Sequence, residues 1–145
     1  MPEMGRLLDI AGGPNSVRTV VDVGANDGAD SLPYARRFPT IRFIAVEPTP
    51  DLARTLESES SGLENYTVVA CAIGRTDGDA VLRIRRFSVH NSLEQVEHPN
   101  VSRVGLSIDA YDIQEEVLVP VRTLASLCRA WRAGDRCPAC RCSGL

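Results

Sequence analysis

The sequence contains no lysine. All 16 of its basic residues are arginine, and 19 acidic residues bring the formal net charge to -3. A chain without excess positive charge has no electrostatic footprint for nucleic acid, so we expect no nucleic-acid partner. The sequence also lacks a basic start followed by a long apolar stretch, and no window approaches the ~20 apolar residues that span a membrane. We therefore expect a cytoplasmic protein that has no membrane partner.

Cysteine is scarce and unevenly placed. There are five cysteines, an odd number, so a secreted disulfide framework is not indicated and reduced thiols are expected. Cys137, Cys140 and Cys142 form a C-x-x-C-x-C pattern, but structural zinc takes four ligands and only three thiols are local, with Cys128 as a conceivable fourth. We predict no metal site, with zinc as the less favoured alternative, and we interpret residues 135–145 as a Cys-rich, disordered tail.

The remaining composition is that of an ordinary globular protein. Hydrophobic residues make up 43% and charged residues 24% of the 145 residues, which fits one domain, here residues 1–134. Three apolar runs read as buried strands: residues 18–24, 41–48 and 67–74. Helical patterns precede or separate them: residues 4–11, 31–37 and 50–58. This alternation predicts a doubly wound α/β fold with a mostly parallel sheet.

The second half of the chain is less regular. Residues 81–87 alternate apolar and basic side chains, as in an antiparallel edge ribbon with one wet face. Residues 88–116 are polar and weakly periodic, which indicates a long surface excursion. A short strand is then expected before a helix capped by Thr123. The apolar stripe of that helix consists of Leu124, Leu127, Cys128 and Trp131.

The stretch "VVDVGANDGADS" ends the first predicted strand in a glycine-bracketed turn, where open α/β sheets bind ligands. In the dinucleotide fingerprint G-x-G-x-x-G the middle glycine lets the backbone approach a pyrophosphate, but Asn26 replaces it here. Asp22 and Asp27 also disfavour a pyrophosphate. S-adenosylmethionine, with an ammonium and a sulfonium, suits acidic and amide groups. Glu47 ends the second strand 23 residues after Gly24, where a carboxylate can accept both ribose hydroxyls.

Structural explanations compete with these roles. Gly24 and Gly28 could serve tight packing without any ligand. Asp22 could simply accept hydrogen bonds from loop amides, since a buried carboxylate needs partners whatever its function. Glu47 is expected to face the cleft, so that its removal would hardly change stability.

Several linked motifs resemble one known family. "VVDVGANDG", "FIAVEPTPDLARTL", "VVACAIGRTDGDAVL", "HNSLEQ" and "VPVRTLASL" occur in the order typical of the FkbM-type S-adenosylmethionine-dependent methyltransferases, across about residues 18 to 128. The resemblance implies a Rossmann-like class I methyltransferase fold and O-methylation of a hydroxyl on a sugar or small natural product. It also implies cofactor-binding residues: Asp22, Gly24, Ala25, Asn26 and Gly28 around the methionine part, Glu47 on the ribose, and Ala72 near the adenine.

No residue can be identified from the sequence as the general base that would remove the proton of the hydroxyl to be methylated. The only histidines, His90 and His98, lie in the polar excursion and are interpreted as solvated loop residues. Ser92, inside "HNSLEQ", matches a family position near the cofactor side, but a turn serine explains it equally. The catalytic residue is therefore left unassigned.

The resemblance breaks after "TLASL". The family pattern continues with a strand ending in Lys-x-Asp-x-Glu-Gly, whereas this chain continues with "RAGDRCPACRCSGL". We therefore expect a truncated domain with an incomplete sheet that self-associates through an open edge, and no turnover by the chain as given. The alternative function is a non-catalytic Rossmann-like binding or assembly module with a vestigial cofactor site.

Overall fold

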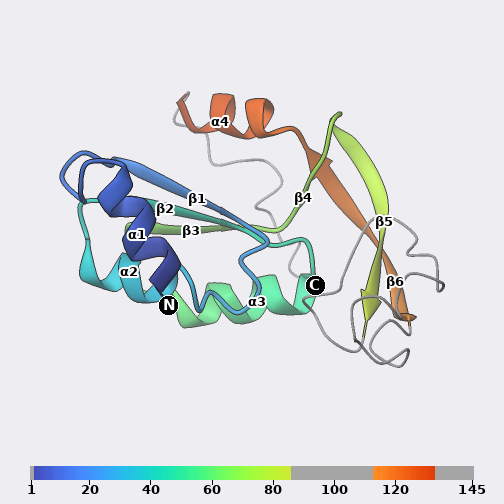
Figure 1. Cartoon of the computed structure of the whole chain (residues 1–145). Coiled ribbons are helices and arrows are strands. Elements are labelled where there is room, and N and C mark those ends of the chain that lie inside the picture. Colours follow the sequence, from blue (N-terminus) through green and yellow to red (C-terminus); the bar gives the residue numbers. More distant parts are fainter. Residues whose placement is uncertain (1, 86–112, 133–145) are drawn as a thin grey trace, which may run out of the picture.

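The computed structural model describes residues 2–85 and 113–132 (Figure 1). Its elements follow in chain order: α1 (Pro2–Ile10), β1 (Thr19–Val23), α2 (Leu32–Arg37), β2 (Arg42–Val46), α3 (Pro50–Glu59), β3 (Tyr66–Val69), β4 (Ala72–Ile73), β5 (Gly78–Arg85), β6 (Ile113–Arg122) and α4 (Leu124–Arg132). The predicted strand and helix alternation in the first 60 residues is confirmed.

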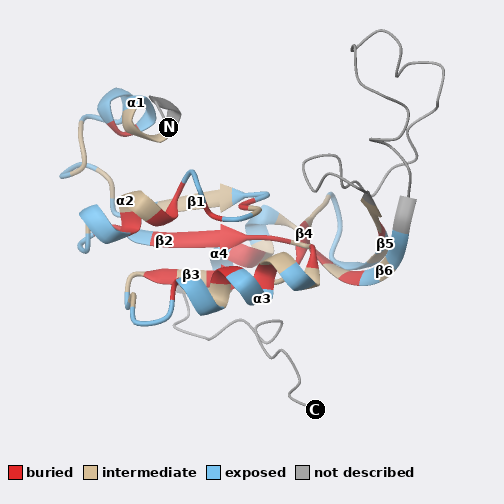
Figure 2. Ribbon diagram, turned by 90° about the horizontal axis from the view of Figure 1, so that it is seen from below, coloured by how far each residue is buried: buried red, intermediate tan, exposed pale blue. Residues whose placement is uncertain are grey.

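A three-stranded parallel sheet with the order β1-β2-β3 forms the centre of the molecule. Val20 of β1 lies opposite Phe43 of β2, which in turn lies opposite Tyr66 of β3. Every residue of β2 after Arg42 is buried, because a parallel strand between two neighbours is covered on both faces (Figure 2). No residue of β1 is fully buried. β2 is thus the central strand, and β1 lies at an edge of this sheet.

Helices cover both faces of the parallel sheet, with α2 and α3 on one side and α4 on the other (Figure 1). On the first side, alternate β2 residues pack with the buried faces of both helices: Phe43 and Ala45 with Leu32, Ala35, Ala53 and Leu56. On the second side, Ile44, Val46 and Val69 pack with Leu127 of α4. Alternation along a buried strand therefore supplies one hydrophobic core per face. The α/β class is confirmed.

The third apolar run corrects the prediction of one continuous sheet. Residues 67–74 were expected to form a single strand, but they divide into the end of β3 and the short β4, which belong to different sheets. Ala72 pairs with Val121 of β6 rather than extending β3. The second sheet has the order β4-β6-β5, so the described part of the chain forms two small sheets and not a full doubly wound sheet.

The second sheet contains the predicted antiparallel ribbon. β5 pairs antiparallel with β6, which is longer than the short strand expected before the last helix. Residues 113–116, assigned above to the polar excursion, belong to β6. Glu115 and Glu116 are both exposed, and Glu116 Oε1 lies 3.0 Å from Arg83 Nε on the neighbouring strand. The rest of that excursion, with His90, Ser92 and His98, lies outside the described residues.

The two terminal helices of the described chain bury less than expected. α1 ends before Gly12 and Gly13, as predicted, yet Leu7 on its predicted apolar face is 55% exposed. In α4, Leu127 is buried, whereas Leu124 is 48% exposed and Cys128 is exposed, which corrects the predicted stripe. Only one side of α4 meets the sheet. None of the helices that the structure describes is long and apolar enough to cross a membrane.

Candidate functional site

The loop after β1 folds over the carboxyl end of β2. The carbonyl oxygen of Val46 accepts hydrogen bonds from the backbone N–H groups of Gly24 and Ala25, at 2.8 and 3.1 Å. Asn26 adopts a left-handed conformation with φ 51°, which lets the chain turn back at this point. The predicted ligand loop and the end of the second strand are therefore neighbours in space, as expected for the carboxyl edge of a parallel sheet.

Glu47 holds this loop. Its Oε2 accepts the backbone N–H of Asn26 at 2.8 Å, and its Oε1 accepts the N–H of Thr49, also at 2.8 Å. The residue is only 4% exposed, so the expectation of a side chain that merely faces a cleft is wrong. The carboxylate is buried because two backbone donors compensate its charge. Each oxygen keeps a further lone pair with which it can accept another hydrogen bond.

Two buried polar atoms on this part of the chain have no partner among the described residues: Asp22 Oδ2 and Asn26 Oδ1. The structural alternative for Asp22, hydrogen bonds from loop amides, is not observed. Buried acceptors are nearly always satisfied, and each exception calls for an explanation such as a ligand or an ordered water. Both atoms can accept hydrogen bonds from a cationic or hydroxylated ligand.

The two glycines of the loop have different reasons to be glycine. Both have positive φ, 78° at Gly24 and 74° at Gly28. A Cβ at Gly28 would lie 2.4 Å from Leu56 Cδ1, whereas a Cβ at Gly24 would meet nothing within 4 Å. The packing explanation therefore holds for Gly28. Gly24 borders open space, so a ligand can approach its backbone.

The remaining predicted site residues are alanines that pack in hydrophobic cores. Ala25 is buried in the core beneath the parallel sheet. Ala72 is buried with Leu82, Val119 and Val121 in the second sheet. Their assignment to a cofactor stays a prediction. Asp27 is exposed and accepts the N–H of Ala29 at 3.1 Å, so it closes a local turn.

A buried pair that the sequence reasoning missed lies under the loop. Ser31 Oγ and Tyr66 Oη are 2.8 Å apart, and Ser31 is completely buried. Burial raises the pKa of the Tyr66 hydroxyl; the Ser31 hydrogen bond lowers it, and the nearby Asp22 charge raises it. Ser31 lies at the N-cap position of α2 but makes no side-chain cap hydrogen bond there. The one available signal was a tyrosine beginning an otherwise apolar strand.

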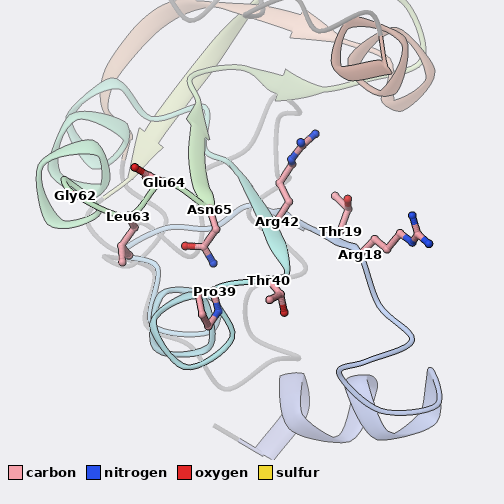
Figure 3. Close-up of a pocket in the computed structure, with 9 residues that line it drawn as sticks. All are labelled: Arg18, Thr19, Pro39, Thr40, Arg42, Gly62, Leu63, Glu64 and Asn65. Atoms are coloured by element: carbon pink, nitrogen blue, oxygen red, sulfur yellow. The ribbon is translucent and has the colours of Figure 1, made fainter.

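An open cavity of about 760 Å³ lies at the opposite, amino edge of the parallel sheet (Figure 3). It is lined by Arg18, Thr19, Pro39, Thr40, Arg42, Gly62, Leu63, Glu64 and Asn65. None of these is a predicted site residue. The amide of Asn65 is already bound to the carbonyls of Ala35, Phe38 and Ile41, so its role there is structural. Size alone favours this cavity, but ligands of open α/β sheets bind at the carboxyl edge.

Metal chemistry finds no support within residues 2–85 and 113–132, where no group of three or more His, Cys, Asp or Glu side chains could hold an ion. The three clustered C-terminal cysteines of the zinc alternative lie outside these residues. Cys128, its proposed fourth ligand, is exposed on α4.

Comparison with known proteins identifies the family of the chain. The model of the methyltransferase FkbM domain matches residues 22–134, from Asp22 near the end of β1 to just beyond α4. No curated protein matches the chain. The match covers most of the 145 residues, including the loop, Glu47 and the strands from β2 to β6. The chain therefore belongs to the FkbM methyltransferase family.

Proposed function

We propose that this chain binds S-adenosylmethionine at the carboxyl edge of β1 and β2, for the O-methylation of a hydroxyl on a sugar or small natural product. The observation that carries the proposal is the pair of buried, unpartnered acceptors, Asp22 Oδ2 and Asn26 Oδ1. They belong to a loop that Glu47 fixes through the backbone of Asn26. A cationic ligand would satisfy both atoms.

The residues fit the parts of that cofactor. Asp22 and Asn26 would accept hydrogen bonds from the ammonium of the methionine part, and the backbone at Gly24 leaves room for it. The remaining lone pairs of Glu47 would accept the ribose hydroxyls. Ala72 follows the carboxyl end of β3, on the side where the adenine is proposed to lie.

When bound, S-adenosylmethionine supplies a methyl group already activated by its sulfonium. The protein must therefore align the oxygen of the acceptor hydroxyl with that methyl group and assist loss of the hydroxyl proton. Asp22 and Glu47 are placed to hold and orient, and neither is assigned as the base. The proposal leaves that role to a residue that is not yet identified.

Isothermal titration with S-adenosylhomocysteine tests the binding step. Asp22→Asn should weaken binding about 10- to 150-fold, because a charge-assisted hydrogen bond is worth about 1.5 to 3 kcal/mol. Asp9→Asn, an exposed carboxylate change on α1, is the matched control and should leave affinity unchanged. Absence of binding by the folded wild-type chain, or equal affinities for wild type and Asp22→Asn, would contradict the proposed site.

The second candidate function, a non-catalytic binding or assembly module, is favoured by one specific observation: within residues 2–85 and 113–132, β1 pairs with a strand on one side only. Labelled S-adenosylmethionine offered with a panel of hydroxylated acceptors separates the two. Methyl transfer above background supports the enzyme. Cofactor binding without transfer to any acceptor supports the module.

A further inference from the structure

The loop after β1, residues 24–31, is organised around Gly28. The N–H of Gly28 donates to the carbonyl of Ala25 at 2.7 Å, and the carbonyl of Gly28 accepts the N–H of Ser31 at 3.1 Å. Asn26 follows Ala25 directly in the chain. Gly28 therefore connects the part of the loop that carries Asn26 with the start of α2.

A buried hydrogen bond supports the second half of this loop. Ser31 Oγ lies 2.8 Å from Tyr66 Oη, and the two residues are 0% and 7% exposed. The Tyr66 hydroxyl also lies next to Gly28, because a Cβ built on that glycine would be 3.4 Å from Tyr66 Oη. Tyr66 belongs to β3, which is separated from β1 by the central strand β2. A side chain from β3 thus contacts the loop that follows β1.

Neither hydroxyl is needed by the element that carries it. Ser31 lies at the N-cap position of α2, but its side chain makes no cap hydrogen bond there. The ring of Tyr66 packs in the hydrophobic core, 6.4 Å from the ring of Phe43, a place that a phenylalanine could also fill. Replacing both members of a buried pair by apolar groups of the same shape can leave stability nearly unchanged. The stability of the fold alone therefore does not account for the pair.

Asp22, whose Oδ2 is one of the two unpartnered acceptors, lies near enough for its charge to act on this pair. Burial is the main cause that raises the pKa of the Tyr66 hydroxyl; the Ser31 hydrogen bond lowers it, and the charge of Asp22 raises it. Tyr66 is therefore protonated at neutral pH and keeps its hydrogen bond with Ser31. The pair adjoins both the strand end that carries Asp22 and the loop that carries Asn26.

We propose that Ser31 and Tyr66 are positioning residues of the cofactor site. This role rests on the proposed function. Their hydrogen bond holds Gly28 beside β3, and the backbone hydrogen bonds of Gly28 carry that restraint to Asn26. The acceptor Asn26 Oδ1 is thereby kept in a fixed place relative to Asp22 Oδ2. Both hydroxyls act through the loop backbone, and a site whose acceptors are already fixed loses less entropy when it binds its ligand.

Isothermal titration of the full chain with S-adenosylhomocysteine tests this role in Tyr66→Phe, Ser31→Ala and the double variant. Each should bind about 2- to 30-fold more weakly than the wild type, the range for residues that act on a ligand through others. The double variant should bind no more tightly than the single ones, although urea denaturation should show stability regained, because no buried hydroxyl then lacks its partner. If the pair only stabilised the fold, every variant that is folded during the titration would bind like the wild type.

The matched control is Ser60→Ala. It removes the hydroxyl of another buried serine, which donates to the carbonyl of Glu57 at the end of α3, and it should leave affinity unchanged. Circular dichroism melts establish that each variant is folded at the temperature of the titration.

Amide hydrogen exchange tests the restraint on the loop without any cofactor. In the double variant the N–H groups of Asn26 and Gly28 should exchange faster by a similar factor, measured relative to the N–H of Phe43 in β2. Unchanged exchange at both loop amides, or a double variant that binds S-adenosylhomocysteine as tightly as the wild type, would overturn the positioning role. A wild type that binds no S-adenosylhomocysteine, together with faster loop exchange in the double variant, would support the restraint and refute the proposed function alone.

Discussion

The backbone N–H of Asn26 and the carboxylate of Glu47 are joined by a 2.8 Å hydrogen bond across 21 residues of sequence. The other carboxylate oxygen of Glu47 binds the N–H of Thr49, at the start of α3. One buried side chain thus fixes both the loop after β1 and the entry to the next helix. Any substitution of Glu47 must therefore act on the fold, whatever it does to the proposed cofactor binding.

Glu47→Ala should therefore lower the free energy of unfolding by about 1.5 to 3 kcal/mol, because hydrogen bonds to a buried charge are lost and two backbone donors are left unsatisfied. Urea denaturation followed by circular dichroism measures this. Glu64→Ala removes an exposed glutamate and should have almost no effect. A Glu47→Ala protein as stable as wild type would show that the loop does not need this carboxylate.

Substitution of the two loop glycines should have unequal effects. Gly28→Ala places a methyl group 2.4 Å from Leu56 Cδ1 in addition to straining a positive φ, so it should destabilise by about 2 kcal/mol or more. Gly24→Ala meets no neighbour within 4 Å and should cost about 1 kcal/mol, the conformational strain alone. Thermal melts compare the two. Relative to its small effect on stability, Gly24→Ala should weaken S-adenosylhomocysteine binding more than Gly28→Ala does. Equal losses of stability in the two variants would contradict the predicted difference.

Tyr66 should contribute to stability in a pH-dependent way. Its pKa in the folded chain is raised above 10.0, chiefly by burial, so the folded state holds the proton more tightly than the unfolded state. The stabilisation is complete below pH 10 and is lost as the pH rises through the folded pKa. Tyr66→Phe, which cannot titrate, should lose less stability between pH 9 and 11 than wild type.

The same variant also tests the Ser31 hydrogen bond. At pH 7, Tyr66→Phe should lower stability by about 1 to 3 kcal/mol, because Ser31 Oγ is left buried without its partner. The double variant with Ser31→Ala should be less destabilised than the sum of the two single changes. Strictly additive losses would mean that the two hydroxyls do not interact.

Asp77 should protect the chain in mild acid. Its Oδ1 accepts the N–H of Thr123 at 2.6 Å and the hydroxyl of Ser126 at 2.8 Å, where α4 begins. The Thr123 backbone hydrogen bond is the main cause that lowers the pKa of Asp77 below 3.8. The stabilisation is therefore present above pH 3.8 and is lost as the pH falls through the folded pKa. In Asp77→Asn, the free energy of unfolding should therefore fall less steeply with pH below pH 4 than in the wild type. Asp79→Asn, which changes an exposed carboxylate on β5, serves as the control.

Local patterns were enough to predict much of this molecule. The β-branched runs around Val20 and Ile44 and the helical spacing of α3 depend on residues a few positions apart, and each element formed where its pattern lies. Thr123 likewise caps α4 as predicted, because Ser126 N–H binds its Oγ1 within one turn. The glycine turn after β1 was visible for the same reason.

Other features depended on contacts between distant residues. The single run at residues 67–74 gave no sign that Ala72 would leave β3 to pair with Val121, because that choice is made by a strand some 50 residues later. The hydrogen bond from Asn26 to Glu47, the Ser31–Tyr66 pair and the Asp77 cap of α4 also join segments far apart in the chain. The sequence by itself determined the elements and the polar loop, because periodicity and turn chemistry are local. Only the tertiary structure decided which acceptors on that loop have partners among the described residues and which strand is central in the parallel sheet, since both depend on what packs beside them.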